Sequence, residues 1–468
     1  MKAGQMRPFV KRIHFVGIGG VGMSGIAHVL LNLGYGVSGS DLKPTEITRR
    51  LKEAGAKIFR GHRASHMRGA DVIVTSSAVS ASNPEVSAAR AEGIPVIARV
   101  AMLAELARLK KTVTISGTHG KTTTTAMTGI ALSAAGADPT MIVGGQVANF
   151  GANAKLGTGD ILVAEADESD GSFLKLNPLV AVVTNIDSDH LDFYGSFASL
   201  KKAFLRHIDS IPFYGAAVLC SDDPVVRELI KKCARPAITY GLEAGAFWRG
   251  KIAAQGMGRG GKWRTRVAVY RNGKKAGFLD LGVAGRHNAQ NALAALAVAD
   301  YFGFDIKKVF KGLAQYEGVG RRLDLLGEAQ GAVFIDDYGH HPTEIETVLE
   351  AIRAMYPKRR LVVIFQPHRF SRTKALYKNF GKSLRGADAA YVMDIYAAGE
   401  KPVRGVNSKL IVDAGRKSGA NVQRFSRTVD VVREIRKNDV VVTLGAGDVW
   451  KTGLDLMRRL KRNRLASL

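Results

Sequence analysis

A phosphate-binding loop is the feature that most constrains this sequence. In the stretch TISGTHGKTTTTA, Thr114 to Ala126, an apolar run is followed by two glycines, a lysine and several threonines. The usual loop reads G-x-x-x-x-G-K-[ST], whereas only two residues separate Gly117 from Gly120 here. The pattern predicts a strand over residues 112–115 and a helix over 122–135. This order of strand, loop and helix predicts an α/β domain that binds nucleotide phosphates.

Two side chains of this loop have predicted roles. The backbone N–H groups and Lys121 are expected to hold the β- and γ-phosphates, and the hydroxyl of Thr122 is expected to bind Mg²⁺. His119 is predicted to be a loop residue without a chemical role.

Acidic residues follow the next predicted strands, as a magnesium site requires. In LVAEADESDGSF, Glu165 lies nearest the strand and is the first choice as a ligand, whereas its neighbours are explained equally well as solvated: Asp167, Glu168 and Asp170. The stretch VVTNIDSDHLDFYGS adds Asp187, Asp189, His190 and Asp192. The residues alone leave His190 open between a metal ligand and a hydrogen-bonded loop residue.

An earlier glycine-rich turn, Gly17 to Gly22, satisfies G-x-G-x-x-G and is followed by Asp41 at the end of the next predicted strand. Such glycines let backbone N–H groups approach a pyrophosphate at a helix N-terminus. The pattern is typical of nicotinamide cofactors, but a UDP-sugar carries a pyrophosphate too, and a glycine turn with packing duties alone is the third reading.

Composition narrows the class of protein. A length of 468 residues predicts about three domains. No apolar run reaches the ~18 residues of a membrane span, and glycines interrupt any signal-peptide core, so we expect a cytoplasmic protein. Two cysteines outside a C-x-x-C pair predict free thiols. The net charge of +27 is spread along the chain without a nucleic-acid motif, which favours anionic small ligands over nucleic acid.

The order of predicted elements indicates three α/β domains, at residues 1–110, 111–320 and 321–468. The first alternates strands with helices. The second begins at the phosphate loop and contains a hairpin around Asn272-Gly273. The third contains four strand-like runs, each followed by a polar loop. Because ligands bind at the carboxyl ends of strands in such sheets, these loops are candidate sites.

A series of motifs in this order resembles the Mur ligase family, and specifically its alanine-adding branch. The resemblance covers nearly the whole chain and rests on HFVGIGGVGMSGIA, GTHGKTTT, EADESDGSFL, NIDSDHLDFY, GRHNAQNALAA, GVGRRLDLLGE, DDYGHHPTE, FQPHRFSRT and DIYAAGEKPVRG. The shortened loop is this family's own ATP-binding form. Relatives that add later residues carry a carbamylated lysine, for which this sequence has no clear counterpart.

The resemblance implies a Rossmann-like N-terminal UDP-sugar domain, a central P-loop ATPase-like domain and a Rossmann-like C-terminal domain. It implies that ATP phosphorylates the lactyl carboxylate of UDP-N-acetylmuramate, and that the amine of L-alanine then attacks the acyl phosphate.

The resemblance also implies site residues. The ATP site would contain Gly117, Thr118, His119, Gly120, Lys121, Thr122, Thr123, His287, Asn288, Asn291, Arg322 and Asp337. One Mg²⁺ would bind Thr122 and Glu165, and a second His190. The UDP-sugar would contact Gly17, Gly19, Gly20, Gly22, Met23, Ser24, Asp41 and Ser76. The alanine would contact Tyr338, His340, Arg369 and Arg372. Catalytic roles would fall on Lys121, Glu165, His190, Asp337, Arg369 and Arg372.

Other interpretations remain at this stage. A nicotinamide-dependent oxidoreductase would use the first glycine turn but would not need the second. A UDP-sugar sensor without activity would not need Lys121 or Glu165. A recycling ligase would attach a preformed peptide to the same sugar. Arg369 and Arg372 are also explained as partners of surface acids, and the turn DYGHH as purely structural. A zinc site on His340-His341 lacks a third soft ligand nearby in sequence.

Overall fold

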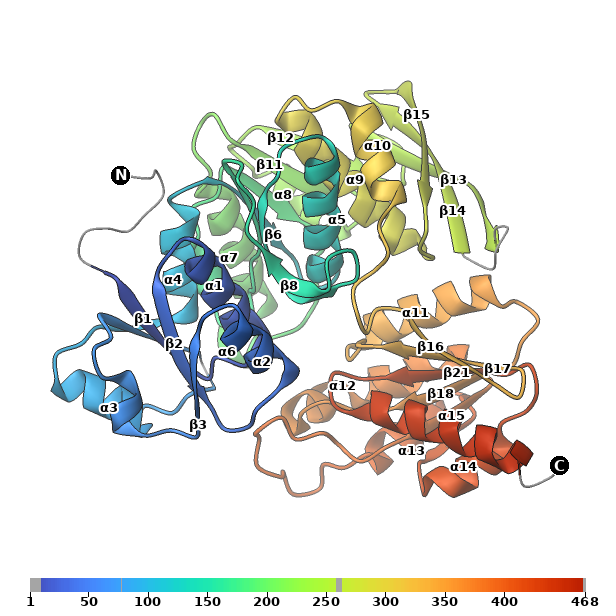
Figure 1. Cartoon of the computed structure of the whole chain (residues 1–468). Helices are drawn as coiled ribbons and strands as arrows, with labels where there is room; N and C mark the ends of the chain where they lie inside the picture. The colour runs from blue at the N-terminus through green and yellow to red at the C-terminus, as the bar shows by residue number, and fades with distance from the viewer. Residues whose placement is uncertain (1–9, 77, 258–262, 466–468) are drawn as a thin grey trace. The chain divides into compact units, whose positions relative to one another are not determined.

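The computed structural model describes residues 10–76, 78–257 and 263–465, with the backbone alone at Val21, Asp192 and 463–465 (Figure 1). The basic N-terminal start and the side chain of Asp192 therefore lie outside the described residues. By compactness the chain forms two units. The first comprises residues 1–254, 265–282 and 288–317, and the second 255–264, 283–287 and 318–468. Each unit is described by itself.

The first domain is a parallel five-stranded sheet in the order β3-β2-β1-β4-β5. Its central strand β1 has four buried residues after one exposed arginine, and three of the four are apolar, as a strand covered on both faces requires. The strand order reverses beside β1, which is where open α/β sheets bind ligands. The elements are β1 (Arg12–Val16), α1 (Val21–Asn32), β2 (Gly36–Asp41), α2 (Glu46–Glu53), β3 (Lys57–Arg60), η1 (Ala64–Met67), β4 (Val72–Thr75), α3 (Pro84–Ala91), β5 (Val96–Ala98) and α4 (Arg99–Ala107).

The second domain is built on a ten-stranded mixed sheet in the order β15-β14-β13-β12-β11-β10-β6-β9-β7-β8. Its parallel centre places β6 between β9 and β10. The predicted hairpin is confirmed, because β14 and β15 pair antiparallel across Asn272 and Gly273.

The strands of this domain are β6 (Lys111–Ser116), β7 (Thr140–Val147), β8 (Ala152–Lys155), β9 (Ile161–Glu165), β10 (Val180–Val183), β11 (Ala216–Cys220), β12 (Ala237–Gly241), β13 (Trp248–Met257), β14 (Trp263–Arg271) and β15 (Lys274–Leu281). The helices are α5 (Lys121–Ala134), η2 (Ser172–Lys175), α6 (Leu191–Tyr194), α7 (Phe197–Asp209), α8 (Pro224–Ile230), α9 (Arg286–Tyr301) and α10 (Ile306–Ala314).

The third domain is a six-stranded sheet in the order β16-β17-β21-β18-β19-β20, parallel except for the edge strand β16. All four predicted strands of this domain are present. The elements are β16 (Asp324–Ala329), β17 (Ala332–Asp337), α11 (Pro342–Met355), β18 (Leu361–Phe365), α12 (Phe370–Ser383), η3 (Leu384–Gly386), β19 (Ala389–Val392), α13 (Lys409–Lys417), β20 (Val422–Arg424), α14 (Thr428–Glu434), β21 (Val440–Leu444) and α15 (Val449–Leu465).

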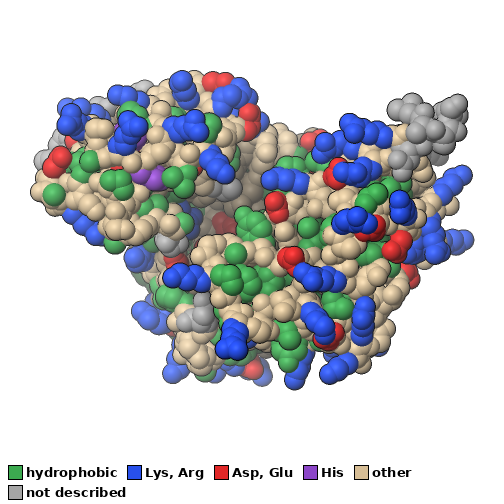
Figure 2. All heavy atoms as spheres, turned by 90° about the horizontal axis from the view of Figure 1, so that it is seen from below, with side chains coloured by type: hydrophobic (Ala, Val, Ile, Leu, Met, Phe, Trp, Pro, Cys, Tyr) green, Lys and Arg blue, Asp and Glu red, His purple; other side chains and the backbone are tan. Residues whose placement is uncertain are grey.

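Lysine and arginine side chains are scattered over the face shown in Figure 2 and do not form one continuous stripe. None of the helices in the described part of the chain has the length and apolar character needed to cross a membrane.

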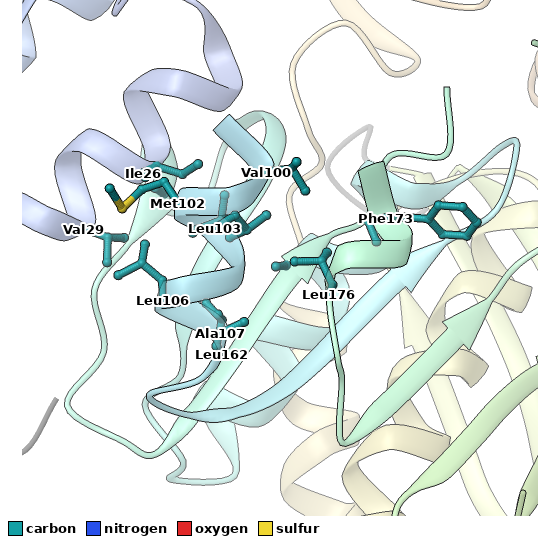
Figure 3. Close-up of a cluster of buried hydrophobic side chains, with 14 of the residues drawn as sticks. Ile26, Val29, Val100, Met102, Leu103, Leu106, Ala107, Leu162, Phe173 and Leu176 are labelled. Atoms are coloured by element: carbon teal, nitrogen blue, oxygen red, sulfur yellow. The ribbon is translucent and has the colours of Figure 1, made fainter. Parts of the chain in front are cut away.

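The first two domains share one apolar core (Figure 3). Met102, Leu103 and Leu106 of α4 are buried with Ile26 of α1 and Leu162 of β9. Each such side chain contributes about 1.5–3 kcal/mol when it is removed from water. Helix α4 therefore joins the first two domains into one packed unit.

Candidate active site

The first glycine loop joins the end of β1 to α1, and the end of β2 fixes its shape. The carbonyl of Ser40 accepts hydrogen bonds from the N–H groups of Gly17 and Ile18 at 2.8 and 3.0 Å, and the carboxylate of Asp41 accepts one from Gly19 at 2.9 Å. A Cβ at residue 19 would lie 2.8 Å from that carboxylate, so only glycine allows this approach. The structure brings these predicted substrate residues together.

The other predicted substrate residues of this domain differ in exposure. Gly20 is the N-cap of α1. Ser24 is buried, and its hydroxyl accepts a hydrogen bond from Asn153 at 3.2 Å. Met23 is also buried, and its side chain packs in the apolar core that the first two domains share. Ser76 directly follows β4, at the same carboxyl edge of the sheet as the glycine loop.

Arg99, at the start of α4, is a candidate ligand residue that the sequence analysis missed. A Cβ on Gly22 would lie 2.4 Å from its Nη1, so the guanidinium packs directly against the glycine loop. Its charge also helps to lower the pKa of Asp167 in the second domain. The described residues offer Arg99 no hydrogen bond or ion pair. No local motif marks this residue, because it lies far along the chain from the first glycine loop, Gly17 to Gly22.

The second glycine loop joins β6 to α5 and surrounds Lys121, the first residue of that helix. The ammonium group donates to the carbonyls of Gly117 and Thr118 at 2.7 and 3.2 Å. Gly117 has a φ of +129°, and a Cβ there would lie 2.1 Å from the hydroxyl of Thr184, so this position requires glycine. The local prediction of strand, loop and helix is confirmed to within one residue at the start of the helix.

The acids after β9 surround this lysine. Glu168 is 1% exposed, and its Oε1 and Oε2 lie 3.0 and 2.9 Å from the Lys121 ammonium. Glu168 is therefore not a solvated residue, contrary to one sequence interpretation. Its burial follows from the turn after β9, which the sequence pattern did not indicate. Asp170 is exposed, which agrees with the solvated interpretation.

Glu165 and His190 mark two sides of this acidic cluster. The Oε2 atom of Glu165 accepts hydrogen bonds from the Thr122 hydroxyl at 3.0 Å and the Gly144 N–H at 2.8 Å. His190 has a φ of +55°, and its Nε2 lies 4.0 Å from Oε1 of Glu168. The predicted magnesium residues Thr122, Glu165 and His190 thus gather around one loop.

The remaining loop residues are held by the strand end after β10. Asn185 accepts a hydrogen bond from the His119 N–H at 2.8 Å, and the Asp187 N–H donates to the Thr118 hydroxyl at 2.9 Å. His119 Nε2 lies 3.2 Å from Asp187. On α9, Asn288 and Asn291 are buried, and the side-chain oxygen of Asn291 lies 3.0 Å from where Gly120 would carry a Cβ. Thr123 is buried in the first turn of α5.

Charge in this cluster is strongly coupled. Burial would lower the pKa of Lys121, but the carboxylates of Glu168, Asp167 and Glu165 outweigh it and raise the pKa well above the usual value. Burial would likewise raise the pKa of Asp167, but Lys121 and the Ser169 N–H lower it. Lys121 is therefore a permanent cation held within a set of anions.

The second unit gathers its own predicted residues at the carboxyl end of β17. Asp337 is buried, and its carboxylate accepts hydrogen bonds from the N–H groups of Leu323 at 2.8 Å and Gly339 at 2.7 Å. Burial raises the pKa of Asp337 to about 6, although nearby Arg322 opposes the shift. The guanidinium of Arg322 lies 5.3 Å from the Tyr338 ring centre and 3.9 Å from Glu344.

Two histidines of this unit are held neutral. Burial lowers the pKa of His340 to about 3, and its Nδ1 lies 3.1 Å from the Tyr338 carbonyl. Burial, assisted by Arg322, lowers the pKa of His287 to about 4. The ring of His340 lies 5.7 Å from that of His368, which the sequence analysis did not single out.

Arg369 and Arg372 begin helix α12. Arg369 is exposed and has a φ of +69° and a ψ of 143°, a conformation that side chains other than glycine rarely adopt. Its N–H donates to the Tyr396 carbonyl at 2.8 Å. Nη1 of Arg372 lies 3.4 Å from Nδ1 of His368. Burial would raise the pKa of Glu400, but hydrogen bonds from Ser371 outweigh it and lower the pKa, and the charge of Arg369 adds to this lowering. A surface acid therefore remains an alternative partner of Arg369.

A buttressing arginine was also missed. Arg321, next to the predicted Arg322, donates to Asp336 at 2.8 Å and to the carbonyls of Gly447 and Gly445 at 2.9 and 2.6 Å. Its φ of +61° turns the chain into β16. The pair Arg321-Arg322 in GVGRRLDLLGE pointed to this position. The sequence did not show that Arg321 holds the backbone while Arg322 is the predicted ligand contact.

Three family models match consecutive parts of the chain: the Mur ligase catalytic domain at residues 12–111, the Mur ligase middle domain at 115–299, and the Mur ligase glutamate ligase domain at 321–447. The chain belongs to the Mur ligase family. It therefore has the three-domain α/β fold of that family, as the resemblance implied.

Relatives match over nearly their full length. A UDP-N-acetylmuramate–L-alanine ligase of Endomicrobium trichonymphae is 51% identical, covering 96% of this chain and 98% of the relative. The enzyme of that name from Desulfatibacillum aliphaticivorans is 48% identical, covering 94% and 97%. The crystal structure of UDP-N-acetylmuramate–alanine ligase from Thermotoga maritima superposes with a TM-score of 0.80 at 30% identity, covering 97% and 99%.

Proposed function

We propose that this Mur ligase is an ATP-dependent enzyme that joins L-alanine to the lactyl carboxylate of UDP-N-acetylmuramate, giving ADP and phosphate, in peptidoglycan precursor synthesis. The observation that carries the proposal is the Lys121–Glu168 pair inside the shortened glycine loop, with Thr122 and Glu165 beside it. A protein that only binds nucleotide does not need a buried lysine among carboxylates. The names of the curated relatives agree with this function.

The reaction needs an activated carboxylate, because oxide is a very poor leaving group. Transfer of the γ-phosphoryl group of ATP to the lactyl carboxylate releases ADP and forms an acyl phosphate. The neutral amine of L-alanine then attacks the acyl carbon, the tetrahedral intermediate expels phosphate, and the amine proton is lost to solvent or a base. The protein contributes positioning and charge stabilisation to the phosphoryl transfer.

The second glycine loop binds ATP in this proposal. Backbone N–H groups from Gly117 to Thr123 surround the phosphates, and Lys121 stabilises charge on the transferred group. Asn288 and Asn291 of α9 lie beside the loop and contact the nucleotide. His287, Arg322 and Asp337 are proposed as further ATP contacts.

The acidic cluster fits magnesium. Oxygen donors are the ligands that Mg²⁺ prefers, and the Thr122 hydroxyl and the Glu165 carboxylate lie 3.0 Å apart beside the loop. Thr122 and Glu165 would hold one ion, and His190 a second. Bound Mg²⁺ would neutralise charge on the phosphate oxygens.

The other two reactants are assigned to the remaining loops. The first glycine loop holds the pyrophosphate of the UDP-sugar through backbone N–H groups, with Asp41, Ser76 and Arg99 around it. Tyr338, His340, Arg369 and Arg372 surround the amino acid, since the planar guanidinium matches a carboxylate better than an ammonium does. Neutral His340 avoids repulsion with the amine of L-alanine. Because ATP is the phosphoryl donor, we also propose a cytoplasmic location.

Phosphate release with UDP-N-acetylmuramate, ATP and a panel of acceptors tests the function. L-Alanine should react fastest. Glycine and L-serine should react more slowly, since one methyl group is worth about 1–3 kcal/mol in an apolar pocket. The tripeptide L-Ala-D-Glu-diaminopimelate should not react. Preference for the tripeptide would assign the chain to the recycling ligases instead.

A further inference from the structure

A buried carboxylate lies behind the first glycine loop and has no role in the proposed reaction. Glu85, in the first turn of α3, is completely buried. Its Oε2 accepts a hydrogen bond from the Ser40 hydroxyl at 2.6 Å and lies 3.3 Å from Nδ1 of His62. Its Oε1 lies 3.1 Å from Nδ1 of His66. A carboxylate removed from water requires such compensation.

A third histidine completes the cluster. His14, on the central strand β1, is completely buried, and its Nε2 points at Glu85 Oε2 from 3.8 Å without a hydrogen-bond partner in the described residues. Its other nitrogen lies 2.8 Å from the Ser38 hydroxyl. Within the described part of the chain, the ion-pair partners of Glu85 are these three histidines, without a lysine or arginine.

The charge of this cluster therefore depends on histidine protonation. Burial would raise the pKa of Glu85, but the interaction with His14 and the hydrogen bond from Ser40 outweigh it and lower the pKa to about 2. Glu85 is thus an anion at every pH at which the enzyme works. Histidine, by contrast, changes charge between about pH 5 and 8.

The groups around the cluster leave this dependence intact. Strand β5, which packs against α3, carries no ionisable residue. The ring of Phe59 on β3 stacks on His66 with centres 4.4 Å apart, and the Lys57 ammonium lies 5.1 Å from the Phe59 ring centre. The nearest further anion along β2 is Asp41, whose carboxylate binds the Gly19 N–H.

Two connections join the cluster to the glycine loop. The Ser40 hydroxyl donates a hydrogen bond to Glu85. The Ser40 carbonyl accepts hydrogen bonds from the N–H groups of Gly17 and Ile18. The carbonyl of Asp41 accepts the N–H of Gly61 at 2.7 Å, and Gly61 precedes His62 in the chain. Glu85 is therefore joined through Ser40 to the strand end that holds the loop.

We propose that Glu85 is a positioning residue for the UDP-sugar: with His14, His62 and His66 it forms a proton-linked anchor that fixes the first glycine loop. The inference rests on the proposed function, which assigns the UDP-sugar to this loop. When a histidine is protonated, the cluster compensates Glu85. When the histidines are neutral, an uncompensated negative charge lies behind a loop that must bind a pyrophosphate, and binding weakens.

Calorimetry of UDP-N-acetylmuramate binding between pH 6 and 8 tests the proposal. The wild-type Kd should rise about five-fold or more over this range, the usual lower bound for coupled binding events. Because linkage is reciprocal, binding near pH 7 should also take up a fraction of a proton, measured by comparing buffers of different ionisation enthalpy. Glu85→Gln keeps an acceptor for Ser40 but removes the charge, and should flatten the Kd profile and abolish the proton uptake.

Two controls and a second variant make the outcomes distinct. Glu92→Gln, at the exposed end of the same helix, should keep the wild-type profile. The ATP Kd should have the same pH dependence in all variants. Should Glu85→Gln fail to fold, His62→Gln must reduce the proton uptake. An equal Kd slope in wild type and Glu85→Gln, or no proton uptake by wild type, would overturn this inference alone. Absence of UDP-sugar binding to the wild type would overturn the proposed function and this inference together.

Discussion

The two glycine loops of this enzyme share a backbone plan. Each follows a buried parallel strand, each begins a helix, and each is held by the end of the neighbouring strand. Ser40 and Asp41 hold the first through the N–H groups of residues 17 to 19. In the second, the carbonyl of Asn185 accepts the N–H of Thr118 at 3.0 Å. In the proposed function, both loops thus direct backbone N–H groups to a phosphate.

The ionisable side chains around the loops differ. The second loop contains Lys121, paired with buried Glu168 and flanked by Glu165 and His190. The first contains no ionisable residue, and the guanidinium of Arg99 approaches it from α4. Under the proposed assignment, the backbone geometry is common to both phosphate sites, and the surrounding charges distinguish the site that holds a phosphate from the one that transfers it.

The largest expected effect separates the two loops directly. Lys121→Ala should reduce turnover by at least about 10²–10³-fold, the scale for loss of one preorganised charged donor, while the Kd of UDP-N-acetylmuramate stays within about two-fold. Phosphate release and calorimetry measure the two quantities. Lys111→Ala, which removes an exposed lysine paired with Asp160, is the matched control. If UDP-sugar affinity falls as far as ATP affinity, the loops do not have separate ligands.

The pH dependence of stability should differ between the buried groups behind the two loops, His207 behind the second and the Glu85 cluster behind the first. His207 is completely buried 3.0 Å from the Thr114 hydroxyl on β6, and burial lowers its pKa to about 4. Because the folded-state pKa lies below the unfolded value, the unfolded chain binds the proton first. Stability is fully present above about pH 6.5 and falls by about 3 kcal/mol as the pH decreases to 4.

Urea unfolding across this range measures the effect. His207→Gln should be less stable than wild type at pH 8, but the difference should shrink between pH 6.5 and 4.5. Glu85→Gln should behave differently, because the pKa of Glu85 is lowered to about 2 and its carboxylate is protonated in the unfolded chain only below about pH 4.5. Parallel pH curves for wild type and His207→Gln would show that His207 titrates normally.

Much of this arrangement could be predicted from sequence, but only where the determinants are local. Lys121, Thr122 and Glu165 lie in contiguous patterns, so their meeting at the ends of β6 and β9 followed from strand order. Glu168 is buried and Asp170 is exposed, and this difference arises from tertiary packing. The spacing of apolar residues in the sequence does not predict it. Arg99 approaches a loop far from it in sequence. Met23 belongs to a ligand-like motif, yet α1 turns its side chain into the shared core.

A smaller effect tests the first loop alone. Arg99→Ala should raise the Kd of UDP-N-acetylmuramate about 10- to 100-fold, since a hydrogen bond to a charged group contributes about 1.5–3 kcal/mol. The ATP Kd should not change. Arg108→Ala, at the exposed end of the same helix, is the control. This result would mirror that of Lys121→Ala, and an Arg99→Ala enzyme with weakened ATP binding and normal UDP-sugar binding would reverse the assignment.

The final prediction concerns residues that belong to neither loop. Arg369→Ala and Arg372→Ala should raise the KM for L-alanine about 10-fold or more, with the Kd values of ATP and UDP-N-acetylmuramate unchanged, and Lys374→Ala should have no effect. Arg369 adds a test of backbone strain, because its φ of +69° favours glycine.

Arg369→Gly should lose alanine binding as Arg369→Ala does. It should nevertheless be more stable in urea than Arg369→Ala by about 1 kcal/mol, because glycine adopts this conformation without the strain that costs other residues about 1–3 kcal/mol. The larger unfolded-state entropy of glycine offsets part of this gain. If the two variants have equal stability, the strain is relieved in solution. If Arg369→Gly retains normal alanine affinity, the strained backbone serves another purpose, and Arg372 alone recognises the carboxylate.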